Sequence, residues 1–345
     1  MRAQAERRCL IIAHRGASAL VPEHTLEAYA IAARLGADYI EPDLVMTRDG
    51  VLIARHDNVL NLTTDVADHP EFAARRTRRS VDGVSVEGWF SEDFTLAEIR
   101  TLRAIERIAE VRPRNAMFNG RFAVPTFDEI LELAAALAAE SGRTIGVYPE
   151  TKHPTHFADA GLAMERPLLE ALARHGFAGP DAAVFIQSFE IGNLRALAGM
   201  TGLPLIQLLG TEGKPFDVQA NGGATTYAEM ATATGLKTVA GYAAGVGPEK
   251  NRFIIPLRDD GGLDIARTSA FVADAHAAGL LVHPYTFRAE NCFLPAQYRR
   301  PGPATAPGDL DGELAAFLAA GIDGFFTDNV EAGVRACRAI GHRDG

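Results

Sequence analysis

Short apolar segments alternate along this chain with amphipathic segments of helical period, and this alternation constrains the fold more than any other feature. The expected strands are Cys9–Ala13, Tyr39–Val45, Val51–Ala54, Thr144–Pro149, Ala183–Ser188, Pro204–Leu208, Leu280–Pro284 and Gly324–Thr327, with a weaker one near Val239–Gly245. The expected helices begin after Thr126 and cover Leu168–Arg174, Asn193–Ala198, Ile265–Ala278 and Glu313–Ala320. Such alternation predicts a parallel sheet with crossover helices.

The number of these units favours a closed TIM (β/α)8 barrel over a Rossmann sheet, whose Gly-x-Gly-x-x-Gly turn the sequence lacks. A bare barrel needs about 250 residues, and this chain has 345. We therefore expect one barrel domain over residues 1–345, with an insertion at about 58–124 lying over the catalytic face. This segment is polar, contains the basic run Arg75-Arg76-Thr77-Arg78-Arg79 and holds the only tryptophan, Trp89.

Composition excludes several classes of function. The net charge of -10 argues against nucleic-acid binding, which needs a basic surface. The three cysteines, Cys9, Cys292 and Cys337, lack the spacing of a zinc site and are too few for a disulfide scaffold. No apolar run is long enough to span a membrane. The charged start, Met1 to Arg8, leads directly into a short apolar strand, so as the chain stands we expect the cytoplasm, or the periplasm or secretion if a signal peptide has been removed.

Carboxylates follow two of the expected strands. Glu41 and Asp43 are two residues apart, so both face the same side of their strand. Pro42 between them lacks an N–H, so the regular ladder is expected to end near Ile40. Glu150 follows a later strand. The carboxyl ends of barrel strands lie together at one face, and carboxylate oxygens there suit a hard cation such as Ca²⁺ or Mg²⁺.

Imidazoles and cations follow the same set of strands. His14 and Arg15 end the first strand, His56 follows Val51–Ala54, and Lys152 lies two residues beyond the last carboxylate. Arg15 and Lys152 would neutralise a phosphate. Imidazole titrates near neutral pH, so His14 and His56 suit general acid and base. The combination predicts a site that cleaves phosphodiesters.

At this point the sequence resembles the glycerophosphodiester phosphodiesterase family, most closely its bacterial periplasmic type. The matching stretches run in order over most of the chain: His14-Arg15-Gly16-Ala17-Ser18, Pro22-Glu23-His24-Thr25-Leu26-Glu27-Ala28, Gly36-Ala37-Asp38-Tyr39-Ile40-Glu41-Pro42-Asp43-Leu44, Arg55-His56-Asp57, Tyr148-Pro149-Glu150-Thr151-Lys152, Val282-His283-Pro284-Tyr285-Thr286 and Gly324-Phe325-Phe326-Thr327-Asp328.

The resemblance implies a TIM barrel that holds one divalent cation, Ca²⁺ favoured and Mg²⁺ as the alternative. It implies hydrolysis of glycerophosphodiesters to sn-glycerol 3-phosphate and an alcohol such as choline or ethanolamine. It carries acid–base roles to His14 and His56, metal ligation to Glu41, Asp43 and Glu150, and phosphate contacts to Arg15 and Lys152. The family often has asparagine where this chain has His24, which affects the surroundings of the ligands.

The substrate is expected to be a small molecule, and the candidates for the wall around it are Trp89, Phe189, His283, Tyr285 and Phe287. One alternative is a phosphodiesterase of the same fold that acts on lysophospholipids or other phosphodiesters. Another is a catalytically silent barrel that binds phosphorylated ligands. The preferred alcohol, the metal, the assignment of acid and base to the two histidines and the oligomeric state are not determined by the sequence.

Overall fold

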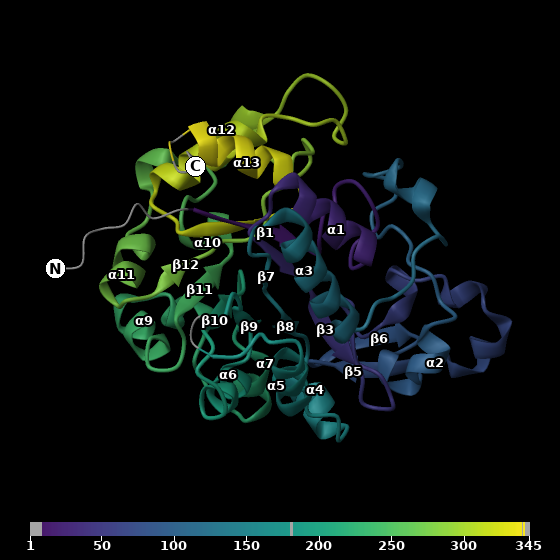
Figure 1. Ribbon diagram of the computed structural model, residues 1–345. Helices are drawn as coiled ribbons and strands as arrows, with labels where there is room; N and C mark the ends of the chain where they lie inside the picture. Colours follow the sequence, from purple (N-terminus) through teal and green to yellow (C-terminus); the bar gives the residue numbers. More distant parts are fainter. Residues whose placement is uncertain (1–8, 180–181, 340, 342–345) are drawn as a thin grey trace.

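Parallel strands form a barrel at the centre of the computed structural model, which describes residues 9–179, 182–339 and 341 (Figure 1). The barrel strands are β1 (Leu10–His14), β2 (Tyr39–Glu41), β3 (Asp43–Met46), β7 (Gly146–Val147), β8 (Glu150–Thr151), β9 (Ile186–Ser188), β10 (Leu205–Leu209), β11 (Gly245–Pro248), β12 (Leu281–Val282) and β13 (Gly324–Thr327). The start of the chain, residues 1–8, on which the expected compartment rests, lies outside the described residues.

Parallel pairing runs from strand to strand around the barrel. β13 pairs with β1, β1 with β2, β2 with β7, β3 with β8, and the pairing continues in chain order from β8 to β12. Backbone hydrogen bonds from Asp323 N to Val282 O and from Phe326 N to Pro284 O, both 3.0 Å, join the last strand to β12. The barrel is thereby closed, as the strand–helix alternation predicted.

Helices cover the outside of the barrel (Figure 1). The longer ones are α1 (Leu26–Leu35), α3 (Phe127–Ser141), α5 (Glu165–Arg174), α6 (Ile191–Ala198), α9 (Ala233–Val239), α11 (Phe271–Ala277), α12 (Leu310–Ala319) and α13 (Val330–Ala339). The short ones are α2 (Leu96–Ile99), α4 (Pro154–Asp159), α7 (Phe216–Ala220), α8 (Tyr227–Met230) and α10 (Lys250–Phe253). No helix among the described residues is both long and apolar enough to cross a membrane.

Helix α3 begins where the sequence predicted. The Thr126 side chain accepts a hydrogen bond from the Glu129 backbone N–H, and the Glu129 carboxylate accepts one from the Thr126 backbone N–H. Its apolar side chains then recur at helical spacing and are buried: Phe127, Ile130, Leu131, Ala134 and Leu137. The local capping signal and the apolar face therefore agree with the observed helix.

Three expected elements differ from the structure. The strand expected at Val51–Ala54 is β4 (Leu52–Ala54), which runs antiparallel to β3, because the connection of residues 47–51 is far too short for a parallel crossover. The weak strand near Val239–Gly245 is wrong, because Val239 is buried at the end of α9 and the strand begins at Gly245. The helix expected at Ile265–Ala278 begins only at Phe271.

Segment 58–124 extends to one side of the barrel and contains a two-stranded hairpin, β5 (Thr77–Val81) and β6 (Val84–Gly88) (Figure 1). The basic run leads into this hairpin, with Arg75 and Arg76 before β5 and Arg78 and Arg79 on it. Arg78 contacts Glu87 at 2.7 Å on the facing strand, and Arg79 reaches Glu92, also at 2.7 Å. The bounds of the insertion, and one domain over residues 1–345, stay predictions.

Candidate active site

A cavity of about 350 Å³ lies at the carboxyl ends of the barrel strands. Seven side chains that the sequence singled out for chemistry line it together: His14, Arg15, Glu41, Asp43, His56, Glu150 and Lys152. His56 reaches the cavity by a different route from the others. Strand β4 runs antiparallel to β3, so its end at Ala54 lies beside Leu44 at the start of β3. His56 follows Ala54 and therefore comes close to Asp43.

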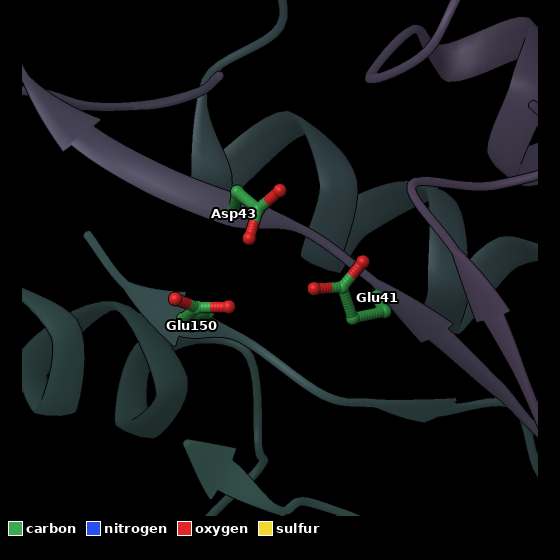
Figure 2. A group of neighbouring side chains, drawn as sticks. All are labelled: Glu41, Asp43 and Glu150. Carbon is green, nitrogen blue, oxygen red and sulfur yellow. The ribbon is translucent and has the colours of Figure 1, made fainter. Parts of the chain in front are cut away.

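The three carboxylates gather at one side of this cavity. Glu41 ends β2, Asp43 begins β3 and Glu150 begins β8, and one oxygen of each lies within 4.8 Å of the others (Figure 2). The ladder does not stop near Ile40 as expected. Pro42 still offers its carbonyl, which accepts from Glu150 N at 2.9 Å, so pairing with the neighbouring strand continues into β3.

These carboxylates are buried and crowd one another. Burial raises the pKa of Glu41 well above its usual value, and the charges of Asp43 and Glu150 raise it further. Burial, offset in part by Lys152, raises the pKa of Glu150 to about 8. Buried like charges repel unless a cation lies between them. The donor set is all oxygen, so these residues fit a hard divalent cation.

Fixed partners orient each carboxylate. Glu41 accepts from the Arg15 backbone N–H at 2.8 Å and from Gln187 Nε2 at 3.0 Å. Lys152 Nζ contacts Glu150 Oε1 at 2.8 Å. Gly16 permits the turn that aims the Arg15 N–H, because a Cβ at this position would come within 2.7 Å of the backbone of Ala28.

Asp43 is held by His24. His24 Nε2 lies 2.9 Å from Asp43 Oδ2, and its Nδ1 lies 2.7 Å from the hydroxyl of Tyr29. His24 is completely buried. It therefore acts as a rigid support behind one carboxylate of the group.

His14 has a carboxylate partner directly after the last strand of the barrel, β13. Its Nδ1 lies 2.6 Å from Asp328 Oδ1, and the other oxygen of Asp328 binds Arg112 at 2.7 Å and Arg288 at 2.9 Å. An ionised carboxylate only accepts hydrogen bonds, so Nδ1 carries the hydrogen and Nε2 keeps its lone pair. Arg112 comes from segment 58–124 and also binds Glu290 at 2.6 Å.

His56 has a carboxylate partner next to it in the sequence. Its Nδ1 lies 2.9 Å from Asp57 Oδ1, and Arg107 of segment 58–124 binds Asp57 Oδ2 at 2.7 Å. Its Nε2 lies 3.3 Å from Lys152 Nζ. Since an ammonium only donates, Nε2 is the acceptor, and the ring has the same tautomer as His14.

Both imidazoles are neutral at pH 7. Burial, followed by the positive charge of Arg15, lowers the pKa of His14 to about 4. The same two causes, with the charge of Lys152, lower the pKa of His56 to about 3. Each ring can therefore accept a proton at Nε2, and the negative charge of a bound phosphate would favour the protonated form.

Of the five aromatic or imidazole side chains expected as substrate walls, Phe189 and Tyr285 line the cavity. Three do not. Trp89 is buried within segment 58–124, where its indole N–H donates to Phe72 O at 2.7 Å, and Phe287 packs on Phe317 and Phe325 in the core. His283 is completely buried, and its Nδ1 lies 2.9 Å from the Tyr148 hydroxyl.

Sequence reasoning gave no role to four polar residues of this site: Gln187, Asp328, Arg112 and Arg288. Two of them carry a signal, since Gln187 and Asp328 lie at the ends of predicted strands. Arg112 lies in a segment without periodic pattern, and its partner Asp328 is 216 residues away. Only the fold brings such a pair together.

Known proteins match the chain over most of its length. The profile of the Glycerophosphoryl diester phosphodiesterase family matches residues 14–332. A glycerophosphodiester phosphodiesterase of Arabidopsis thaliana is 36% identical, with 92% of this chain and 82% of the relative covered. A glycerophosphodiester phosphodiesterase of Haemophilus influenzae is 30% identical, with 96% and 90% covered.

Solved structures share the fold. An Oleispira antarctica phosphodiesterase in complex with the product sn-glycerol-3-phosphate has a TM-score of 0.61 at 17% identity, with 96% of each chain covered. A glycerophosphodiester phosphodiesterase of Agrobacterium tumefaciens has a TM-score of 0.57 at 18% identity, covering 94% of this chain and 99% of that one. At these identities the likeness establishes the TIM barrel alone. The family profile and the two sequence relatives establish more: this chain belongs to the glycerophosphoryl diester phosphodiesterase family.

Proposed function

We propose that this protein hydrolyses glycerophosphodiesters to sn-glycerol 3-phosphate and an alcohol, with the help of one divalent cation. The observation that carries the proposal is a single cavity lined by three clustered carboxylates and by two histidines, each of which is bonded to a further carboxylate. Two relatives that bear the name glycerophosphodiester phosphodiesterase support it, as does the structural neighbour with bound sn-glycerol-3-phosphate.

The carboxylates Glu41, Asp43 and Glu150 would hold the cation. When bound, a divalent cation polarises phosphate oxygens and makes a nearby hydroxyl easier to deprotonate. Ca²⁺ is favoured by the likeness to the periplasmic type, and Mg²⁺ is the alternative. The raised pKa values of the buried Glu41 and Glu150 support this assignment, because a cation would relieve the repulsion among the carboxylates.

The remaining residues would bind the phosphate and move protons. Arg15 and Lys152 would offset the phosphate charge, and Arg288, which also lines the cavity, adds a third positive group. One histidine would take a proton from the attacking hydroxyl and the other would give one to the leaving alkoxide, each transfer worth roughly 10²–10⁴ in rate. If the attacking group is the glycerol 2-hydroxyl, a cyclic phosphate forms and is hydrolysed next; if it is water, hydrolysis is direct.

The test is release of sn-glycerol 3-phosphate from glycerophosphocholine, with and without a chelator. We expect the chelator to abolish release and added Ca²⁺ or Mg²⁺ to restore it. Glu150→Gln should lose cation binding in calorimetry, whereas Glu170→Gln, an exposed acid on α5, should bind as the wild type does. Release that persists in chelator would exclude the cation from the reaction.

A panel that includes a lysophospholipid tests the alternative substrate class. The cavity lining is dominated by charged and polar side chains, which does not favour an acyl chain. We therefore expect glycerophosphodiesters to react faster than a lysophospholipid, and the opposite order would replace the proposed substrate.

A further inference from the structure

A second cavity adjoins the first on the far side of Lys152 and Phe189. Its volume is about 320 Å³, and both of these residues, together with Glu150, line both cavities. The residues that it does not share come from four places: the β5–β6 turn, the end of β8 with the start of α4, the end of β9, and the loop and helices after β10. A group attached to a phosphate in the first cavity would therefore meet this second one, which we call the hairpin cavity.

Aromatic rings form one wall of the hairpin cavity. Phe189 and Tyr227 meet edge to face with their centroids 6.2 Å apart, and Phe216 lies in the same lining. Gly210 leaves the room that the Tyr227 ring occupies, because a Cβ at residue 210 would lie 2.9 Å from that ring. Faces of aromatic rings attract cations.

A buried acid, Glu190, also lines the hairpin cavity. Glu190 is only 3% exposed, and its carboxylate is bonded by the hydroxyl and backbone N–H of Thr155, both uncharged groups. Burial raises the pKa of Glu190 to about 7, and the nearby charges of Asp217 and Asp82 also raise it. Such a carboxylate gains stability from a cation placed beside it.

The hairpin supplies a second acid. Asp82 and Gly83 form the two-residue turn between β5 and β6, both with positive φ, and the turn approaches Phe216 and Gln219 of α7. Asp82 Oδ2 binds His153 at 2.6 Å, whereas its Oδ1 is buried without a hydrogen-bond partner in the described structure.

One cation of the chain lines the hairpin cavity outside the shared residues, and it is turned to another partner. Lys214 donates from Nζ to the carbonyl of Gly223 at 3.1 Å. In the described part of the chain no ion pair joins it to Glu190 or Asp82. Among the described residues, no Lys or Arg pairs with Glu190 or Asp82 or lies over the ring of Tyr227, whereas Lys152 Nζ already lies 5.6 Å from the centroid of the Phe189 ring.

We propose that the hairpin cavity binds the leaving alcohol and selects alcohols that carry an ammonium group over neutral ones. This inference rests on the proposed hydrolysis of glycerophosphodiesters. It assigns the discrimination to Glu190, Asp82 and Tyr227, none of which the proton transfers require. Aromatic faces beside carboxylates are the chemistry that recognises substituted ammonium groups.

The experiment compares kcat/KM for glycerophosphocholine with kcat/KM for glycerophosphoglycerol, whose leaving alcohol is neutral. We expect the wild type to favour the choline ester by about tenfold or more, since removal of one desolvated cation contact changes affinity by roughly that factor. Glu190→Gln should lower this ratio about tenfold, and Asp82→Asn about threefold.

Glu212→Gln is the matched control, because it removes one exposed negative charge in the loop after β10 without lining the cavity. It should keep the wild-type ratio. If Glu190→Gln does not fold, Asp82→Asn decides the result, since it changes a half-exposed side chain at a hairpin tip. Equal ratios in the wild type and the variants would contradict the proposal that the hairpin cavity selects ammonium alcohols. If the wild type hydrolyses neither ester, the proposed function itself is wrong.

Discussion

The two histidine–carboxylate pairs have the same bonding pattern but different construction. His14 meets Asp328 across 314 positions of sequence, and that carboxylate is fixed by two arginines in a buried network. His56 meets its neighbour Asp57, and their side chains are 31% and 24% exposed. One pair depends on closure of the barrel, the other on local geometry. The same hydrogen bond to a ring nitrogen can therefore depend on the whole fold in one pair and on two adjacent residues in the other.

From this difference we propose a direction of proton transfer. His14 is neutral at pH 7 in the free protein, and the charge of a bound phosphate together with the buried Asp328 would favour its protonated form, which suits it to the acid role. His56 Nε2 accepts from the ammonium of Lys152, which disfavours its protonated form and suits it to the base role. We therefore expect His14 to protonate the leaving alkoxide.

The largest expected effect on the rate comes from removing the imidazole of each pair in turn. His14→Ala and His56→Ala should each reduce kcat for glycerophosphocholine by roughly 10²–10⁴. A glycerophosphodiester with a nitrophenol leaving group needs no acid, so it should restore much of the rate of His14→Ala but not that of His56→Ala. Rates measured with both esters check this. Recovery in His56→Ala instead would reverse the assignment.

The next largest effect is on stability, where the two partner carboxylates, Asp328 and Asp57, are expected to differ. Asp328→Asn leaves Arg112 and Arg288 without their shared charge in a buried site, so it should lower the free energy of unfolding by about 3–5 kcal/mol. Asp57→Asn removes a partly exposed pair and should cost about 1 kcal/mol or less. Urea unfolding of both variants gives the comparison. Similar losses would mean that burial does not distinguish the pairs.

The smallest expected effect is the loss of folding stability at low pH. The pKa of His14 is about 4 in the folded protein and 6.5 in the unfolded chain, so as pH falls from about 6.5 the unfolded state takes up a proton that the folded state refuses. Stability is therefore lost on acidification, by about 2 kcal/mol between pH 7 and pH 5 for this residue. Solvent screens the more exposed His56, so its contribution should be smaller.

Unfolding in chelator at the two pH values tests this difference. His14→Gln should reduce the acid-induced loss of stability more than His56→Gln does. A larger change in His56→Gln would show that the exposed pair carries the titration.

Sequence reasoning succeeded where the signal is local or repeats along the chain. The strand alternation predicted the barrel, and the capping pattern at Thr126 predicted helix α3. The expected site residues proved to line one cavity, although His56 arrives on an antiparallel strand rather than a barrel strand. The strand pattern did not predict this placement, which results from the short turn of residues 47–51 between β3 and β4.

Two kinds of feature were missed for different reasons. The Asp82-Gly83 pair is a typical two-residue hairpin turn, so the turn between β5 and β6 was predictable from the sequence. The partnership of Asp328 with His14 and Arg112 was not, because it depends on β13 lying beside β1. The wall positions Trp89, His283 and Phe287 failed because residue type alone does not distinguish a cavity lining from a core.

The adjacency of β1 and β13 also has a consequence for the synthesis of the enzyme. His14 is made 314 residues before Asp328, its carboxylate partner, which follows β13. A growing chain therefore carries an unpaired His14 until β13 has been translated and has joined β1. On the proposed mechanism, incomplete chains would be unable to protonate a leaving group well, so hydrolysis would begin only when the barrel seam closes.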